Sequence, residues 1–93
     1  MLIQTISPDR FRWFCQNLRQ SAQIAPLEAS YTVPLMVNDT EYTVRLQPFG
    51  ENQIAVLQAL RIDREENGPT FTLIEDDDLL FSFLTLLLKQ GMA

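Results

Sequence analysis

Apolar and polar side chains alternate most regularly over residues 31–47, the pattern of two strands that each bury one face. Between them stands Asn38-Asp39, and both residue types tolerate the positive φ of a two-residue hairpin turn. Pairing the two runs across this turn sets apolar residues opposite one another, so the turn and the register agree. The predicted pairs are Tyr31 with Leu46, Val33 with Val44, Leu35 with Tyr42 and Val37 with Thr40.

A third strand is predicted over residues 53–63, which are nearly continuous in apolar side chains. One face of this strand is expected to carry Ile54, Val56, Leu60 and Ile62, and the other face Ala55, Leu57 and Ala59. A helix over residues 53–62 is the alternative, because some of the same apolar residues also recur every third position.

Two features mark the borders of the predicted sheet. Residues 70–74 follow a polar turn and predict a short fourth strand, with Phe71 and Leu73 facing the core. Pro34 offers no amide donor, which predicts that the first strand of the hairpin lies at a sheet edge. Met36 points outward from that edge and is a candidate partner-binding residue, since an exposed edge can accept an extended segment; a merely solvated edge is the alternative.

Residues 7–25 show the period of a helix. Ser7 can accept a hydrogen bond from a free amide of the first turn, and Pro8 suits the first helical position. Pro26 is expected to end the helix shortly after Ile24. The apolar stripe of this helix consists of Phe11, Phe14, Cys15, Leu18 and Ala22.

Trp13 lies outside that stripe, about 150° from its centre at 100° per residue. Tryptophan is enriched as an anchor at protein interfaces, so Trp13 is a second candidate partner-binding residue. The alternative is that residues 1–6 or 25–29 fold over it.

Four consecutive acids at residues 75–78 lead into the most apolar stretch of the chain. The acids suit the first turn of a helix, which Lys89 and Gly91 can end. The ten residues from 79 to 88 are too few to span a membrane, which takes about 20. Consecutive acids on one helix also do not converge on a single metal ion. The polar positions form one narrow line: Asp78, Ser82, Thr85 and Lys89.

A helix that is apolar around most of its girth must be covered on more than one side. One side can lie on the sheet, and in a chain of 93 residues a second copy is the simplest cover for the rest. We therefore expect a homodimer. The alternative is a monomer in which the first helix packs beside the last. The expected dimer contacts are Leu80, Phe81, Leu84, Leu87 and Leu88.

Composition narrows the function classes. Ninety-three residues make one domain, and the net charge of −5 disfavours binding to nucleic acid through a basic patch. Seven of the twelve acids lie between Asp63 and Asp78, where Arg64 is the only base. Cys15 is the single cysteine, so no intrachain disulfide is expected. The first residues also lack the basic and apolar pattern of a secretory signal peptide, and we therefore expect a cytoplasmic protein.

Catalytic chemistry is poorly provided for. The sequence contains no histidine, the commonest general base near neutral pH, and its three glycines form no phosphate-binding loop. Cys15 lies on an apolar helix stripe without a histidine to activate it. We expect no enzyme activity, no cofactor and no metal.

The predicted fold is α+β, in the order α-β-β-β-β-α, with a three- to four-stranded antiparallel sheet and both helices packed on it. Four segments carry this order: "RFRWFCQNL", "YTVPLMVNDTEYTVRL", "NQIAVLQALRI" and "DDLLFSFLTLLL". In order, size and acidity the chain resembles the small acidic dimeric chaperones that serve bacterial type III secretion. The resemblance implies a non-catalytic protein that holds an extended stretch of a secreted protein in grooves beside its two-fold interface. Because the chain is shorter than the usual member, no family site is assigned to individual residues.

Two other classes of function stay open. An inhibitor or immunity protein could block an enzyme through the acidic stretch 63–78, and reversing the charge of Glu65, Glu66, Asp76 and Asp77 would then slow association. A regulatory or structural subunit of a larger assembly would pair its leucine-rich helix with a different chain.

Overall fold

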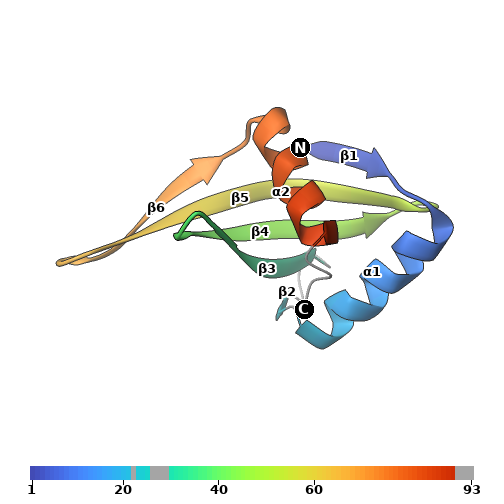
Figure 1. The fold of residues 1–93 in the computed structure, drawn as a ribbon, viewed down its shortest axis with the longest axis horizontal. Coiled ribbons are helices and arrows are strands. Elements are labelled where there is room, and N and C mark those ends of the chain that lie inside the picture. The colour runs from blue at the N-terminus through green and yellow to red at the C-terminus, as the bar shows by residue number, and fades with distance from the viewer. Residues whose placement is uncertain (22, 26–29, 90–93) are drawn as a thin grey trace.

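The computed structural model of the chain describes residues 1–21, 23–25 and 30–89. Its strands pair antiparallel throughout, and two helices lie against the sheet (Figure 1). The α+β class with a helix toward each end is confirmed, although the described residues form six strands rather than three or four. In chain order the elements are β1 (Leu2–Thr5), α1 (Pro8–Ser21), β2 (Gln23–Ala25), β3 (Ser30–Val37), β4 (Thr40–Phe49), β5 (Gln53–Glu65), β6 (Gly68–Ile74) and α2 (Asp77–Lys89).

The long strand β5 organises the sheet. One of its edges pairs with β4, and β3 and β2 follow beyond β4. The other edge pairs with β1 along its first part and with β6 along its second part. Sequence reasoning missed β1, because four residues give too short an alternation to distinguish a strand from a loop.

The hairpin of β3 and β4 has the predicted turn and register. Asn38 and Asp39 have φ of 49° and 66°, as a tight turn of this kind requires. All four predicted pairs, from Tyr31 with Leu46 to Val37 with Thr40, are present. Pro34 is exposed and lies beyond the stretch of β3 that pairs with β2, so it stands at an edge of the described sheet, as expected.

Residues 53–62 form a strand, not a helix, but some side chains of β5 face the side opposite to the prediction. Between Arg45 and Leu46 of β4 the register shifts, because β5 carries one extra residue there, a β-bulge. Beyond the bulge Ala59 faces the helices and is fully buried. Leu60 and Ile62 therefore face away from the helices, so the prediction that they share one face with the first half of the strand is wrong.

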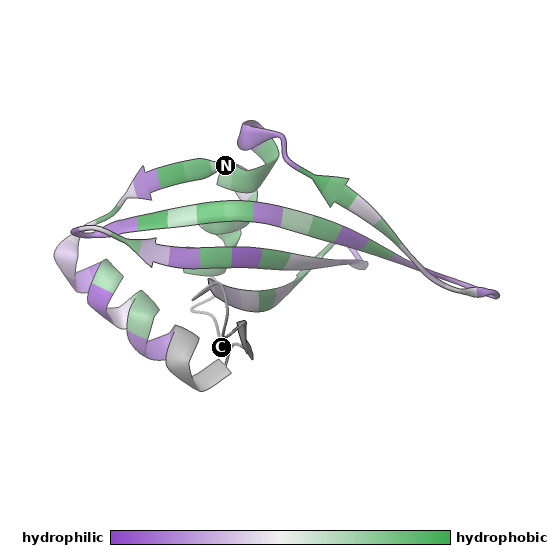
Figure 2. Ribbon diagram, turned by 180° about the vertical axis from the view of Figure 1, so that it is seen from behind, coloured by the Kyte–Doolittle hydropathy of each residue, from purple (hydrophilic) through white to green (hydrophobic). Residues whose placement is uncertain are grey.

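The same bulge corrects the prediction for β6. Phe71 pairs with Ile62 and Leu73 pairs with Leu60, so both side chains follow β5 to the uncovered side of the sheet. They are 60% and 52% exposed rather than facing the core. We call the helix-covered side the front face and the other side the back face; Figure 2 views the sheet from the back, with α2 behind the strands.

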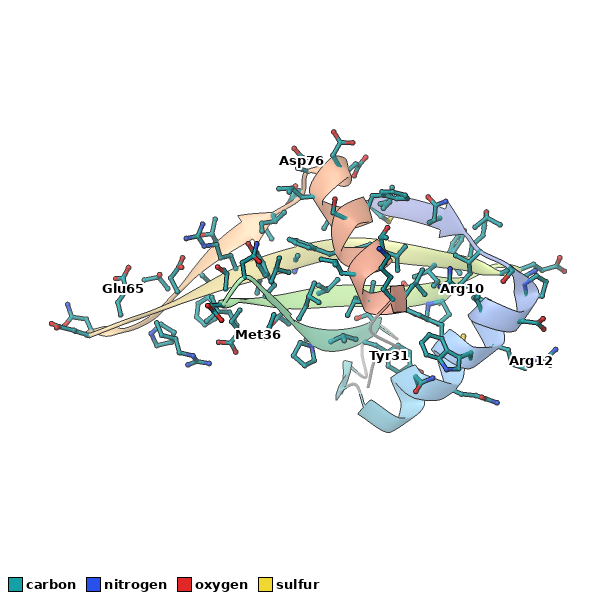
Figure 3. All side chains as sticks on the ribbon, in the orientation of Figure 1. Arg10, Arg12, Tyr31, Met36, Glu65 and Asp76 are labelled. Carbon is teal, nitrogen blue, oxygen red and sulfur yellow. The ribbon has the colours of Figure 1, made fainter. Side chains whose placement is uncertain are left out.

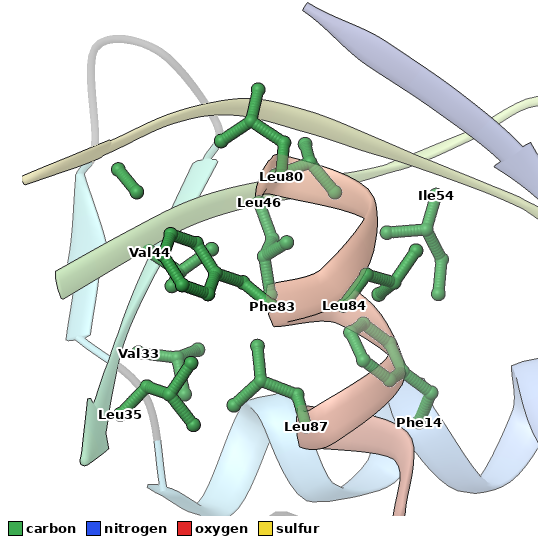
Figure 4. Close-up of a cluster of buried hydrophobic side chains, with 12 residues drawn as sticks. Phe14, Val33, Leu35, Val44, Leu46, Ile54, Leu80, Phe83, Leu84 and Leu87 are labelled. Atoms are coloured by element: carbon green, nitrogen blue, oxygen red, sulfur yellow. The ribbon is translucent and has the colours of Figure 1, made fainter. Parts of the chain in front are cut away.

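The core lies between the front face and the helices (Figure 4). From α2 it takes side chains at steps of three, one and three residues, which is one side of a helix. The ring of Phe83 in α2 packs 4.7 Å, centroid to centroid, from the ring of Tyr42 in β4. The buried cluster consists of Phe14, Val33, Leu35, Val44, Leu46, Ile54, Val56, Ala59, Leu80, Phe83, Leu84 and Leu87.

The helices start at the predicted caps, but α1 ends earlier than predicted. Ser7 Oγ accepts a hydrogen bond from the Arg10 amide at 3.3 Å. Helix α1 ends at Ser21, and residues 23–25 already pair with β3, so the expected helix up to Ile24 is wrong. Pairing with a neighbouring strand overrides local helical periodicity there. The expected stop at Pro26, the cap at Gly91 and a cover for Trp13 from residues 26–29 lie outside the described residues.

Candidate interaction surfaces

Three of the five residues expected in a dimer interface lie inside the chain. Leu80, Leu84 and Leu87 are at most 2% exposed and pack on the front face, which corrects their assignment as contact residues. Phe81 is 47% exposed and Leu88 is half-buried. Only these two of the five are at the surface.

Helix α1 contributes to the core beside α2 but does not pack along the length of that helix. Phe14 of α1 lies in the same buried cluster as Leu84 and Leu87 (Figure 4), whereas the monomer alternative expected α1 to cover the flank of α2. Leu79 and Phe81 on α2 stay about half exposed. The apolar surplus of this helix is therefore smaller than its sequence suggests, but it is not zero.

A groove lies between α1, α2 and β1. It consists of two neighbouring hollows, of about 240 and 260 Å³, which share Arg10 and Leu88 as lining residues. Arg10 and Lys89 supply positive charge to it, and Asp9 supplies one negative charge. We call it the inter-helix groove, and its apolar lining consists of Ile6, Trp13, Phe81, Leu84 and Leu88.

Trp13 belongs to this groove and is neither fully exposed nor fully covered. Its side chain is half-buried against the core, while part of it lines the hollow shared with Leu88. Its carbonyl oxygen accepts a hydrogen bond from Asn17 Nδ2 at 2.8 Å. The groove thus brings together Trp13 and Phe81, one predicted partner-binding residue and one predicted dimer residue.

A second apolar surface stands on the back face. It is made of two neighbouring rows of side chains, since Leu60 pairs with Leu73 and Ile62 pairs with Phe71. Leu60 and Ile62 are half-buried, whereas Phe71 and Leu73 are more than half exposed. On β3 the same rows continue, across β4, with Pro34 and Met36. We call this surface the back-face patch: Pro34, Met36, Leu60, Ile62, Phe71 and Leu73.

Met36 is 58% exposed and joins the patch through a hollow of about 400 Å³ that it lines together with Ile62. Glu41 and Arg64 line the same hollow and form a two-pronged ion pair, with nitrogen–oxygen distances of 3.0 and 3.2 Å. The hydrogen bond and the charge of Glu41 hold the pKa of Arg64 above its ordinary value. Met36 and Trp13, the two predicted partner-binding residues, therefore lie on different surfaces.

The acidic stretch does not form one surface. Glu65 and Glu66 lie at the far tip of the β5–β6 hairpin, whereas Asp76 lies at the start of α2 (Figure 3). Strand β6 separates them by seven residues, about 24 Å at 3.4 Å per residue. An inhibitor steered by these acids would have two distant clusters to present rather than one.

Chemistry-bearing side chains are not clustered in the described part of the chain. Among residues 1–21, 23–25 and 30–89, no group of three or more His, Cys, Asp and Glu side chains is arranged to hold a metal ion. Cys15 lines a hollow of about 430 Å³ with Phe11 and Asn52. No helix in the described residues is long and apolar enough to cross a membrane.

Comparisons of the chain with protein-family models, with curated proteins and with solved structures found no match.

Proposed function

We propose that this chain is a non-catalytic, cytoplasmic protein-binding module that works as a dimer and holds an extended stretch of a partner polypeptide, such as a secreted protein. The observation that carries the proposal is the inter-helix groove, in which Phe81, 47% exposed, and Trp13 line adjoining hollows that share Leu88. Apolar pockets of this kind, with a few charged groups at the border, suit the side chains of an unfolded segment.

The groove favours an unfolded partner over a small metabolite. Each of its hollows is smaller than the roughly 300 Å³ at which ligand pockets begin, and their shared lining makes them a pair of adjacent side-chain sites. Arg10 and Lys89 can pair with carboxylates of the partner. The likeness in element order, size and acidity to secretion chaperones points to the same kind of partner.

The remaining parts of the proposal rest on composition. A sequence without histidine and with a single cysteine supports a non-catalytic role and a reducing compartment. The regulatory-subunit alternative would place a different folded chain on α2, and it predicts poor behaviour of the protein expressed alone.

Co-purification with quantitative identification of bound proteins tests the proposal. Tagged protein taken from its native cells should carry one dominant secreted protein, and that protein should be lost from a Phe81→Asp variant. Ser82→Asp is the matched control, because Ser82 is exposed on the same helix outside the groove lining and should keep the partner. Equal recovery from both variants, or no enriched secreted protein with the parent chain, contradicts the proposal.

A further inference from the structure

We propose that the back face of the sheet is where a second copy of this chain docks, with the back-face patch at the centre of the contact. This inference names the dimer surface and rests on the dimeric form of the proposed function. It also moves that surface from α2, where sequence reasoning placed it, to the opposite side of the molecule, and leaves the inter-helix groove free for a partner.

The first argument is the apolar character of this face. Of the eight large hydrophobic side chains that are exposed in the described chain, five alternate onto the back face. They are Ile3, Met36, Phe49, Phe71 and Leu73. Two of them, Phe71 and Leu73, lie in an edge strand, where exposed apolar residues invite association. An accumulation of this kind on one side of a small protein marks an interaction surface.

The second argument is charge. Each copy carries a net charge of −5, so two copies repel each other wherever acidic surfaces meet. On the strands of the back face the charged residues that the structure describes are Glu41, Arg45 and Arg64. The one acid among them is already paired with Arg64. Two acidic copies therefore meet with least repulsion on this face, whereas a basic partner would be drawn to the acids at α2 or at the β5–β6 tip.

The third argument is area. Strand β5 has 13 residues, and the sheet is five strand positions wide, so its back face measures roughly 40 by 20 Å. That footprint is on the order of 800 Å², the area per partner in a standard stable interface. The five exposed side chains alone offer on the order of 500 Å² of accessible apolar surface.

The shape of the face also suits a second copy. In a two-fold dimer the same patch occurs on both partners, so an apolar surface must be complementary to itself. Two sheets can pack face to face about 10 Å apart through interdigitating side chains. A two-fold axis near Leu60 lays one back-face patch on the other.

The experiment measures solution mass by light scattering after size-exclusion chromatography, over low to high micromolar protein. The parent chain should show twice its 10.7 kDa mass. Phe71→Glu places a charge in the centre of the contact once per copy and should weaken dimerisation by at least about 30-fold. Met36→Glu is a second variant on another strand and should weaken it in the same direction.

Two controls separate the back face from other effects. Thr72→Glu adds the same charge to the same edge strand, but Thr72 is exposed on the front-face side and should leave the dimer intact. Phe81→Glu adds a charge to the inter-helix groove and should also leave it intact. Far-ultraviolet circular dichroism on each variant confirms that its fold is retained.

A parent chain that stays monomeric at high micromolar concentration overturns the inference. Dissociation by Phe81→Glu but not by Phe71→Glu or Met36→Glu also overturns it, since the contact would then lie on the helices. If the back-face dimer forms but no partner is recovered from cells, the partner-holding function fails while this inference stands. If a partner is recovered by a monomeric chain, the inference fails and the holding function stands.

Discussion

Asp76 shows how much a single residue decides at the start of α2. Its Oδ1 accepts hydrogen bonds from the amides of Asp78 at 2.8 Å and Leu79 at 3.3 Å, two of the donors that a helix start leaves unpaired. Its neighbour Asp77 is within the helix and forms an exposed ion pair of 3.6 Å with the N-terminal amine. The four consecutive acids are therefore not equivalent, and only Asp76 caps.

Asp76→Ala should lower the free energy of unfolding by about 1 kcal/mol, because an N-cap acceptor is lost. Asp76→Asn should retain most of the stability, since asparagine caps about as well as aspartate. Urea denaturation measures both. Asp77→Ala is the control and should cost only a few tenths of a kcal/mol, the scale of an exposed charge near a helix dipole. Equal losses for the Asp76→Ala and Asp77→Ala variants would refute the capping role.

At the scale of the element, α2 shows the difference between an apolar sequence and a buried one. Leu79 and Leu80 are neighbours of the same type, yet the first is 46% exposed and the second is fully buried. Leu80→Ala should destabilise the protein by about 2–5 kcal/mol, because it removes core packing and leaves a cavity. Leu79→Ala should cost less than about 1 kcal/mol.

Paired denaturation curves of these two variants check the orientation of α2. Both substitutions change a leucine to alanine in the same helical turn, so their difference reports burial rather than helix propensity. A larger loss for Leu79→Ala than for Leu80→Ala would mean that α2 presents a different side to the sheet.

In strand β5, by contrast, no local sequence pattern indicates which side chains are buried. Its apolar residues at 54, 56, 60 and 62 alternate as one face of a regular strand does, and sequence reasoning placed all four on the same face. The bulge opposite Arg45 and Leu46 reverses the second half, so Ala59 replaces Leu60 beneath the helices. A bulge depends on how two strands fit together, and the residues of one strand do not encode it alone.

For the whole molecule, the proposed dimer has a distinctive response to salt. An interface that is apolar at its centre joins two copies that each carry −5. Added salt screens their mutual repulsion and does not weaken apolar contact. The affinity of the dimer should therefore stay equal or increase between about 50 and about 500 mM NaCl. Over this range the Debye length falls from above to below about 10 Å.

Sedimentation equilibrium at the two salt concentrations gives this dependence directly. Capture of a partner through Arg10 and Lys89 should respond in the opposite direction, because salt screens their pairing with carboxylates. A dimer that dissociates at high salt would contradict an apolar back-face contact and would point to ion pairs across the interface.

Interactions between residues close in the sequence allowed much of this structure to be predicted from the sequence alone. Four features depend only on residues a few positions apart, so a short stretch of sequence contains the interactions that stabilise them. They are the caps at Ser7 and Asp76, the Asn38-Asp39 turn and the register of the β3–β4 hairpin. The α+β class followed from the order of such local patterns. Phe81 and Met36, which were both expected at the surface, are 47% and 58% exposed.

Only the tertiary structure decided which apolar residues are buried in the core and which are left at the surface. Leu80, Leu84 and Leu87 were expected at an interface and are core, whereas Phe71 and Leu73 were expected in the core and are exposed. Both errors have one cause: the burial of a side chain is set by the partner that its element meets. The bulge in β5 decides that partner for β6, and the sheet face beneath α2 decides it for that helix, whatever the sequence of each element.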